Sequence, residues 1–168
     1  MKNKKGFSLM ELLIVVIIIS GFAALTYPSY VIAIERSRVS EAVNMLATIQ
    51  AAQQKNFMSY ESYAPTFREI NDFTPAIEDF DPTENFFYTE YYKYDMSPVI
   101  TSEANKNPKV TATRVDKSHN VLNKGYSLEA YYKENFVRCI YTNDDGDKIC
   151  SALTDKSPNT TDNYYPIY

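Results

Sequence analysis

Residues 5–30 read KGFSLMELLIVVIIISGFAALTYPSY, and this stretch decides how the chain is organised. A single carboxylate, Glu11, stands near its start, and residues 12–34 then continue without a charged side chain. At about 1.5 Å per helical residue this run reaches roughly 34 Å, enough to cross a hydrocarbon core of ~30 Å. A charge at the edge of hydrocarbon costs roughly 3 kcal/mol unless a partner meets it, so the sequence predicts a partner for Glu11.

Three lysines, Lys2, Lys4 and Lys5, precede the apolar run. Positive charge ahead of a span favours keeping the N-terminus in the cytoplasm and placing the rest of the chain outside. A cleavable secretory signal ends in a small-residue site after its apolar core, and no A-x-A-like site of that kind follows Ile19. We therefore expect the apolar segment to be retained.

These residues resemble the N-terminus of type IV pilins and of the related pseudopilins of type II secretion systems. The matching features are a short basic leader that ends in Gly6, the aromatic Phe7, Glu11 inside the apolar run, and a proline, Pro28, where those proteins bend. The resemblance is close over roughly the first 35 residues and covers only the general layout beyond them. It implies that a prepilin peptidase cuts between Gly6 and Phe7 and that the new amino group of Phe7 is methylated.

The resemblance also gives Glu11 a physical role in assembly. Cleavage creates a positive amine on Phe7, which is as poorly placed in a membrane as the carboxylate. If Glu11 of one subunit meets the Phe7 amine of another, both charges lose their penalty and the pairing sets the axial register. The alternative is a signal anchor whose Glu11 lies at the level of the lipid headgroups.

A structural subunit of a type IV pilus is the function that the resemblance implies. Its implied partners are further copies of itself in a homopolymeric filament, the prepilin peptidase, the inner-membrane pilus or secretion assembly machinery, and membrane lipid before assembly. The precursor would cross the bacterial inner membrane once, with its C-terminal domain in the periplasm, before joining an extracellular pilus or a periplasmic pseudopilus. The alternatives are a minor pilin, a type II secretion pseudopilin, and a monomeric membrane-anchored binding or DNA-uptake module.

The predicted fold class is α+β, with a long N-terminal helix packed on a C-terminal antiparallel sheet. An apolar stripe at three- and four-residue steps continues the helix beyond the span. Its members are Val39, Ala42, Val43, Leu46, Ile49, Gln53 and Phe57. Gly21 and Pro28 weaken the helix, and we expect a kink or local melting near Tyr27. The expected parts are a leader at 1–6, a transmembrane and assembly half of the helix at 7–34, an amphipathic half at 35–57, a proline-containing loop at 58–84 and the sheet region at 85–168.

Alternating and aromatic-rich runs after residue 85 predict the strands of the sheet. The predicted strands are Phe86–Tyr94, Lys109–Asp116, Tyr126–Tyr132, Phe136–Thr142 and Lys148–Leu153. In the second of these, Val110, Ala112 and Arg114 share one face. The polar residues 143–147 read NDDGD and are typical of a turn between two strands.

Two cysteines, Cys139 and Cys150, are most simply a disulfide in an exported domain, which would cross-link the last predicted hairpin. A free pair or a metal site is the alternative, although the chain offers one histidine and no other thiol for zinc. Asp144, Asp145 and Asp147 form a candidate calcium site, since calcium prefers carboxylate oxygens. They lack the terminal glutamate and the spacing of an EF-hand loop, and a plain acidic turn is the alternative.

Composition and motifs argue against enzymatic chemistry and against general nucleic-acid binding. The chain has 17 Lys and Arg against 21 Asp and Glu, and loss of the leader would remove three of the lysines. Nucleic-acid binding usually shows a basic patch. No glycine-rich phosphate loop, G-x-S-x-G or H-E-x-x-H motif occurs, so we expect neither a catalytic site nor a cofactor.

Overall fold

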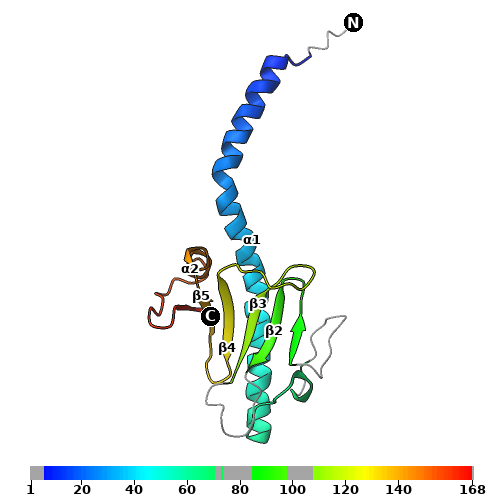
Figure 1. Cartoon of the computed structure of the whole chain (residues 1–168), viewed down its shortest axis with the longest axis vertical. Helices are drawn as coiled ribbons and strands as arrows, with labels where there is room; N and C mark the ends of the chain where they lie inside the picture. The colour runs from blue at the N-terminus through cyan, green and yellow to red at the C-terminus, as the bar shows by residue number, and fades with distance from the viewer. Residues whose placement is uncertain (1–5, 71–72, 74–84, 98–107, 168) are drawn as a thin grey trace. The chain divides into compact units, whose positions relative to one another are not determined.

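The computed structural model describes residues 6–70, 73, 85–97 and 108–167 (Figure 1). The chain divides into two compact units, Met1–Glu35 and Arg36–Tyr168. One helix, α1 (Leu9–Tyr60, 52 residues), contributes to both of them. Residues 71–72 and 74–84 of the predicted loop, and residues 1–5 of the predicted leader, lie outside the described residues.

In the first unit, α1 continues without interruption through Gly21 and Pro28. The local melting expected near Tyr27 is therefore not found, and a bend at the proline stays a prediction. Polar side chains inside this apolar segment bond to the helix itself. The hydroxyl of Ser20 donates to the carbonyl of Ile17 at 2.9 Å, and Thr26 makes an equivalent bond one turn back. Such bonds remove the cost of an unpaired hydroxyl in apolar surroundings.

In the second unit, α1 packs against a six-stranded antiparallel sheet whose strands follow in chain order, as an uncrossed meander (Figure 1). The strands are β1 (Phe86–Tyr88), β2 (Tyr92–Ser97), β3 (Lys109–Arg114), β4 (Tyr126–Tyr131), β5 (Val137–Tyr141) and β6 (Tyr164–Ile167). A short 3-10 helix, η1 (Phe67–Glu69), follows α1, and a second helix, α2 (Asp144–Ser151), lies between β5 and β6. The predicted α+β class is confirmed.

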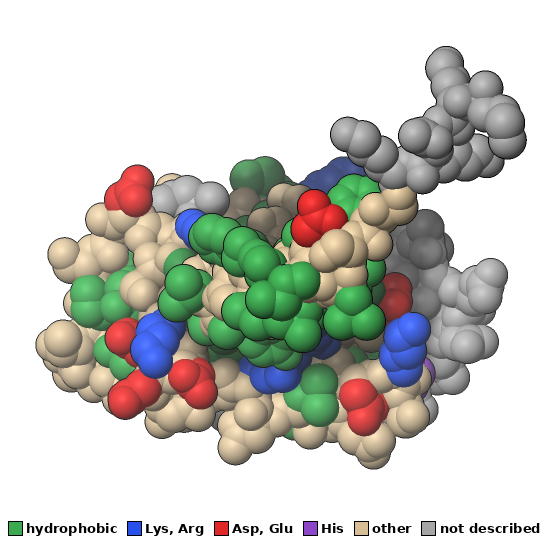
Figure 2. Space-filling view, turned by 90° about the horizontal axis from the view of Figure 1, so that it is seen from above, with side chains coloured by type: hydrophobic (Ala, Val, Ile, Leu, Met, Phe, Trp, Pro, Cys, Tyr) green, Lys and Arg blue, Asp and Glu red, His purple; other side chains and the backbone are tan. Residues whose placement is uncertain are grey.

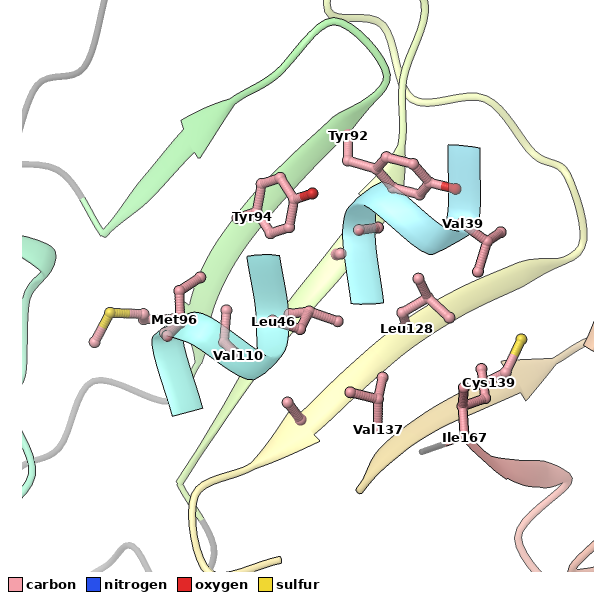
Figure 3. Packing of buried hydrophobic residues seen from close by; sticks show 14 of the residues in the cluster. Val39, Leu46, Tyr92, Tyr94, Met96, Val110, Leu128, Val137, Cys139 and Ile167 are labelled. Atoms are coloured by element: carbon pink, nitrogen blue, oxygen red, sulfur yellow. The ribbon is translucent and has the colours of Figure 1, made fainter. Parts of the chain in front are cut away.

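The core lies between the inner face of the sheet and one side of α1 (Figure 3). Val39 and Leu46 of the helix are fully buried, and they face Tyr94, Val110 and Leu128 of three strands. Burial of each large apolar side chain stabilises the fold by roughly 1.5–3 kcal/mol. The stripe read from the sequence therefore marks the packed side of α1 over most of its length.

The stripe is wrong at its end and incomplete on one side. Phe57 remains 43% exposed and stacks on Tyr63 with ring centroids 4.8 Å apart, because the sheet does not cover the last turn of the helix. Gln50, which is not a member of the predicted stripe, is also buried. Its amide donates to the carbonyl of Tyr131, at 2.6 Å, and to that of Glu134, and these bonds satisfy the polar group in the interior.

In strand β3 the predicted alternation is confirmed, since Val110, Ala112 and Arg114 all point inward and are buried. The buried guanidinium of Arg114 donates to the carbonyls of Tyr91 and Val115 at 2.9 and 2.7 Å. These bonds satisfy a charge that would otherwise be costly in the interior.

The predicted strand Phe86–Tyr94 is two strands, β1 and β2, joined by a tight reversal. The backbone amide of Thr89 donates to the carbonyl of Tyr92 at 2.8 Å, which closes the turn. Aromatic residues run across the turn without glycine or proline, so the strand propensity of the segment hides the break.

The predicted turn at 143–147 and the predicted strand Lys148–Leu153 are both wrong, because the chain forms helix α2 there. The side chain of Asn143 accepts the amide of Gly146 at 2.8 Å and caps the helix. Acidic residues in the first turn suit the positive end of the helix dipole. Strand β6, which the strand pattern did not predict, completes the sheet edge.

Candidate functional site

The apolar half of α1 is covered by nothing in the chain that the structure describes. Side chains from Leu12 to Ile19 are between 47% and 62% exposed, and Leu25 is 78% exposed. The helix contains a stretch long and apolar enough to cross a membrane, by length and composition. The space-filling view shows many hydrophobic side chains exposed together on this face of the molecule (Figure 2). A helix with this exposure needs lipid or another protein around it.

Glu11 and Ser8 form a reciprocal cap at the start of this helix. The backbone amide of Ser8 donates to Oε2 of Glu11 at 2.9 Å, and the amide of Glu11 donates to Oγ of Ser8 at 3.3 Å. The carbonyl of Ser8 also accepts the amide of Leu12 at 3.3 Å. This is a capping box, which satisfies two of the backbone donors that every helix start leaves unpaired.

Sequence reasoning missed this cap, although the signal is present. Ser8 and Glu11 are three residues apart immediately before an apolar run, which is the S-x-x-E pattern of a capping box. The charge of Glu11 by itself predicts only a partner from another molecule, such as the Phe7 amine of a second subunit. The structure gives that carboxylate a local partner as well.

Gly6 and Phe7 lie before the helix begins at Leu9, in exposed chain outside regular structure. Phe7 is 89% exposed, and a Cβ atom added to Gly6 would meet no atom of the described residues within 4 Å. The described part of the chain therefore leaves the bond between these two residues sterically open. Exposed segments of this kind are preferred sites of proteolytic cleavage.

Cys139 and Cys150 form a disulfide between strand β5 and helix α2, with their Cα atoms 5.6 Å apart. The predicted pairing is therefore present, but the predicted hairpin is not, because one of the two elements is a helix. Closure of a loop with a sequence separation of 11 stabilises the fold by roughly 2–3 kcal/mol in the chain-entropy model.

Two glycines allow α2 to lie close against the start of strand β4. A Cβ atom on Gly146 would stand 1.8 Å from the carbonyl oxygen of Gly125. Gly125 itself has a positive φ of 72°, and a Cβ there would overlap the side chain of Asn143. At the other end of α2, a guanidinium nitrogen of Arg36 on α1 donates to the carbonyl of Ala152. The C-terminal region is thus attached to the sheet and to α1.

Three glutamine side chains tie α1 to neighbouring loops. Gln53 is fully buried, and its amide group both donates to the carbonyl of Ala64 and accepts the amide of Ala64, each at 2.9 Å. Gln54 donates to the carbonyl of Tyr132 at 3.2 Å. Together with Gln50, these bonds hold the segment after α1 and the β4–β5 turn against the helix. Their geometry depends on tertiary contacts, and the sequence pattern carries no signal for them.

Two of the three aspartates of the candidate calcium site contact different groups in the structure. Asp145 lies 3.5 Å from the amine of Lys148, and Asp147 accepts the hydroxyl of Tyr165 at 3.0 Å. Across the described residues, no three His, Cys, Asp or Glu side chains gather closely enough to hold a metal ion. All three aspartates lie in the first turn of α2, where acidic residues are favoured by the helix dipole.

Comparison with known proteins identifies the N-terminal segment. The family model for the prokaryotic N-terminal methylation motif matches residues 1–27. The type IV major pilin protein PilA of Myxococcus xanthus (strain DK1622) is 38% identical over 68 residues, which are 40% of this chain and 31% of that relative. No solved structure matches the chain. The N-terminal segment is thus similar to the prokaryotic methylation motif, and the chain is similar to a type IV major pilin over part of its length.

Proposed function

We propose that the chain is a structural subunit of a type IV pilus. A prepilin peptidase removes residues 1–6, the amino group of Phe7 is methylated, and the mature chain waits in the inner membrane with its sheet domain outside the cytoplasm. Copies then leave the lipid and polymerise through the apolar half of α1. In the filament, Glu11 of one copy pairs with the Phe7 amine of another.

The observation that carries this proposal is the position of Glu11. It is the one charged residue in an otherwise apolar, uncovered stretch of α1, and it falls inside the segment that matches the methylation motif. A carboxylate there is costly in hydrocarbon unless a cation meets it. Cleavage after Gly6 supplies a cation of the right charge at the right end of the helix.

The matched relative is described as a major pilin, which favours the main subunit of a filament over a minor pilin or a pseudopilin. The match spans less than a third of that relative, so this choice is part of the proposal. The disulfide supports an exported sheet domain, because such bonds persist mainly outside the cytoplasm.

Mass spectrometry of material sheared from the surface of the producing cells tests the proposal. We expect this chain as the main component of sheared fibres, beginning at Phe7 and carrying one extra methyl group there. A chain that keeps residues 1–6, or that stays in the membrane fraction and never enters fibres, would contradict the proposal. A trace amount within fibres made mainly of another pilin would reassign it as a minor subunit.

A further inference from the structure

The Glu11 carboxylate has two oxygens, and the helix start occupies one of them. Oε2 accepts the amide of Ser8 at 2.9 Å. Within the described part of the chain, no donor lies within hydrogen-bonding geometry of Oε1. A carboxylate can accept about four hydrogen bonds, so the second oxygen has capacity for a cation.

Ser8 restricts where that second oxygen can lie. Its backbone amide holds the carboxylate from one side, and its hydroxyl holds the backbone amide of Glu11 at 3.3 Å. The two bonds close a ring of contacts between residues 8 and 11 that folds the glutamate side chain back over the helix start. Without it, a long side chain with three rotatable bonds would sample many directions around an exposed helix.

We propose that Ser8 is a positioning residue for the pairing of Glu11 with an ammonium group. The cap keeps Oε2 on its own helix and leaves Oε1 to receive the Phe7 ammonium of another copy. The inference rests on the proposed function, and it deepens it by naming the residue that sets the direction of the carboxylate. The same cap also satisfies part of the charge before assembly, because a backbone donor already meets the carboxylate.

Three substitutions at Ser8 test this in the full chain. Ser8→Thr keeps the hydroxyl, Ser8→Val has nearly the shape of threonine without the hydroxyl, and Ser8→Ala removes it with the least change in volume. The measured quantity is the yield of sheared filament per cleaved and methylated chain, so that any effect on the peptidase is removed. Loss of a capping hydroxyl reduces helix-start stability by an amount equivalent to roughly two- to thirtyfold in an equilibrium constant.

We expect Ser8→Thr to give close to the wild-type yield, and Ser8→Val and Ser8→Ala to lose yield by a factor in that range. Equal yields from the threonine and valine variants, whether both normal or both reduced, would overturn the role of the hydroxyl. Glu11→Ala is made in parallel. If it assembles normally, the pairing in the proposed function fails; if it assembles poorly while all Ser8 variants are equal, only the positioning role fails.

A spectroscopic readout tests the geometry without assembly. In the mature chain in detergent micelles, the amide proton of residue 8 should shift as the Glu11 carboxyl titrates, because the two groups are bonded. Glu11→Gln should abolish this shift, Ser8→Thr should retain it and Ser8→Val should weaken it. An amide proton of Ser8 that ignores the titration in the wild-type chain would overturn the proposal.

Discussion

The two halves of α1 both carry apolar side chains, but their surroundings are opposite. In the second half, Val39, Ala42, Leu46 and Ile49 are fully buried under the sheet. In the first half, the side chains from Leu12 to Ile19 are about half exposed. The difference teaches that the fold of this chain accounts for only one half of its helix. The other half needs apolar surroundings that the described part of the chain does not supply.

The difference between the two halves is tested most strongly by the same substitution, leucine to alanine, in each half of α1. Leu46→Ala should lower the free energy of unfolding of the sheet domain by roughly 2–5 kcal/mol, because it leaves a cavity in a packed core. Urea unfolding of the full chain in detergent, followed by near-ultraviolet circular dichroism, measures the change.

Leu13→Ala is the matched control for this substitution. It should change the same unfolding free energy by less than about 0.5 kcal/mol, since Leu13 is 48% exposed in the structure. Equal losses from the two variants would show that the first half also packs on the domain, and the contrast between the halves would then be lost.

Removal of the disulfide by Cys139→Ser with Cys150→Ser should destabilise the sheet domain by roughly 2–3 kcal/mol. The effect arises in the unfolded chain, which regains the freedom of the closed loop, and it should leave membrane insertion of the first half of α1 unchanged. Unfolding midpoints and membrane fractionation of both forms check this. Loss of membrane insertion in the double variant would contradict the independence of the two regions.

Gln53→Ala should cost about 2 kcal/mol of unfolding free energy, because it leaves the amide and the carbonyl of Ala64 unpaired in the interior. Gln54→Ala is the control, since its amide makes one long bond from a half-buried position. We expect the loss from Gln54→Ala to be clearly smaller in the same urea titration. Equal effects would mean that the paired bonds to Ala64 carry no special weight.

The smallest change in the free energy of unfolding at neutral pH is expected when two core tyrosines are replaced by phenylalanine. The hydroxyls of Tyr94 and Tyr132 are buried and have no partner in hydrogen-bonding geometry among the described residues. Burial raises the pKa of both tyrosines above the ordinary value of 10.0. Their neutral forms therefore support the fold fully below pH 10, and this support is lost as the pH rises above that value.

Unfolding measured from about pH 8 to pH 12 should show stability falling above pH 10, with tyrosine ionisation, followed by its ultraviolet absorbance, rising in the same range. Tyr94→Phe and Tyr132→Phe should change stability at neutral pH by about 1 kcal/mol or less and should flatten the alkaline slope. An unchanged slope in both variants would assign the alkaline transition to other groups.

Patterns of apolar side chains that extend over several residues could be read from the sequence. The uncharged run after Glu11, the stripe from Val39 to Ile49 and the alternation of β3 each repeat over several residues, and the structure places them as predicted. The helix α1 and the strand β3 could therefore be predicted, because local patterns of apolar side chains determine them.

The misses occur where one side chain or one tertiary contact decides the outcome. Asn143 turns an acidic, turn-like segment into the start of α2, and the bond between Thr89 and Tyr92 divides a continuous aromatic run into two strands. At the candidate site, the apolar segment and Glu11 are recognisable from the sequence. The cap made by Ser8 was missed because the charge of Glu11 is a more conspicuous signal than its spacing from the serine.

Photo-cross-linking from the first half of α1 tests most directly whether this half is covered by other copies of the chain. A photo-reactive amino acid in place of Val16, introduced into the full chain, is activated in sheared filaments and the products are mapped by mass spectrometry. We predict cross-links to residues 9–34 of a second copy of the chain. Cross-links confined to the sheet domain of the same copy, or no cross-link between copies in intact filaments, would contradict this prediction.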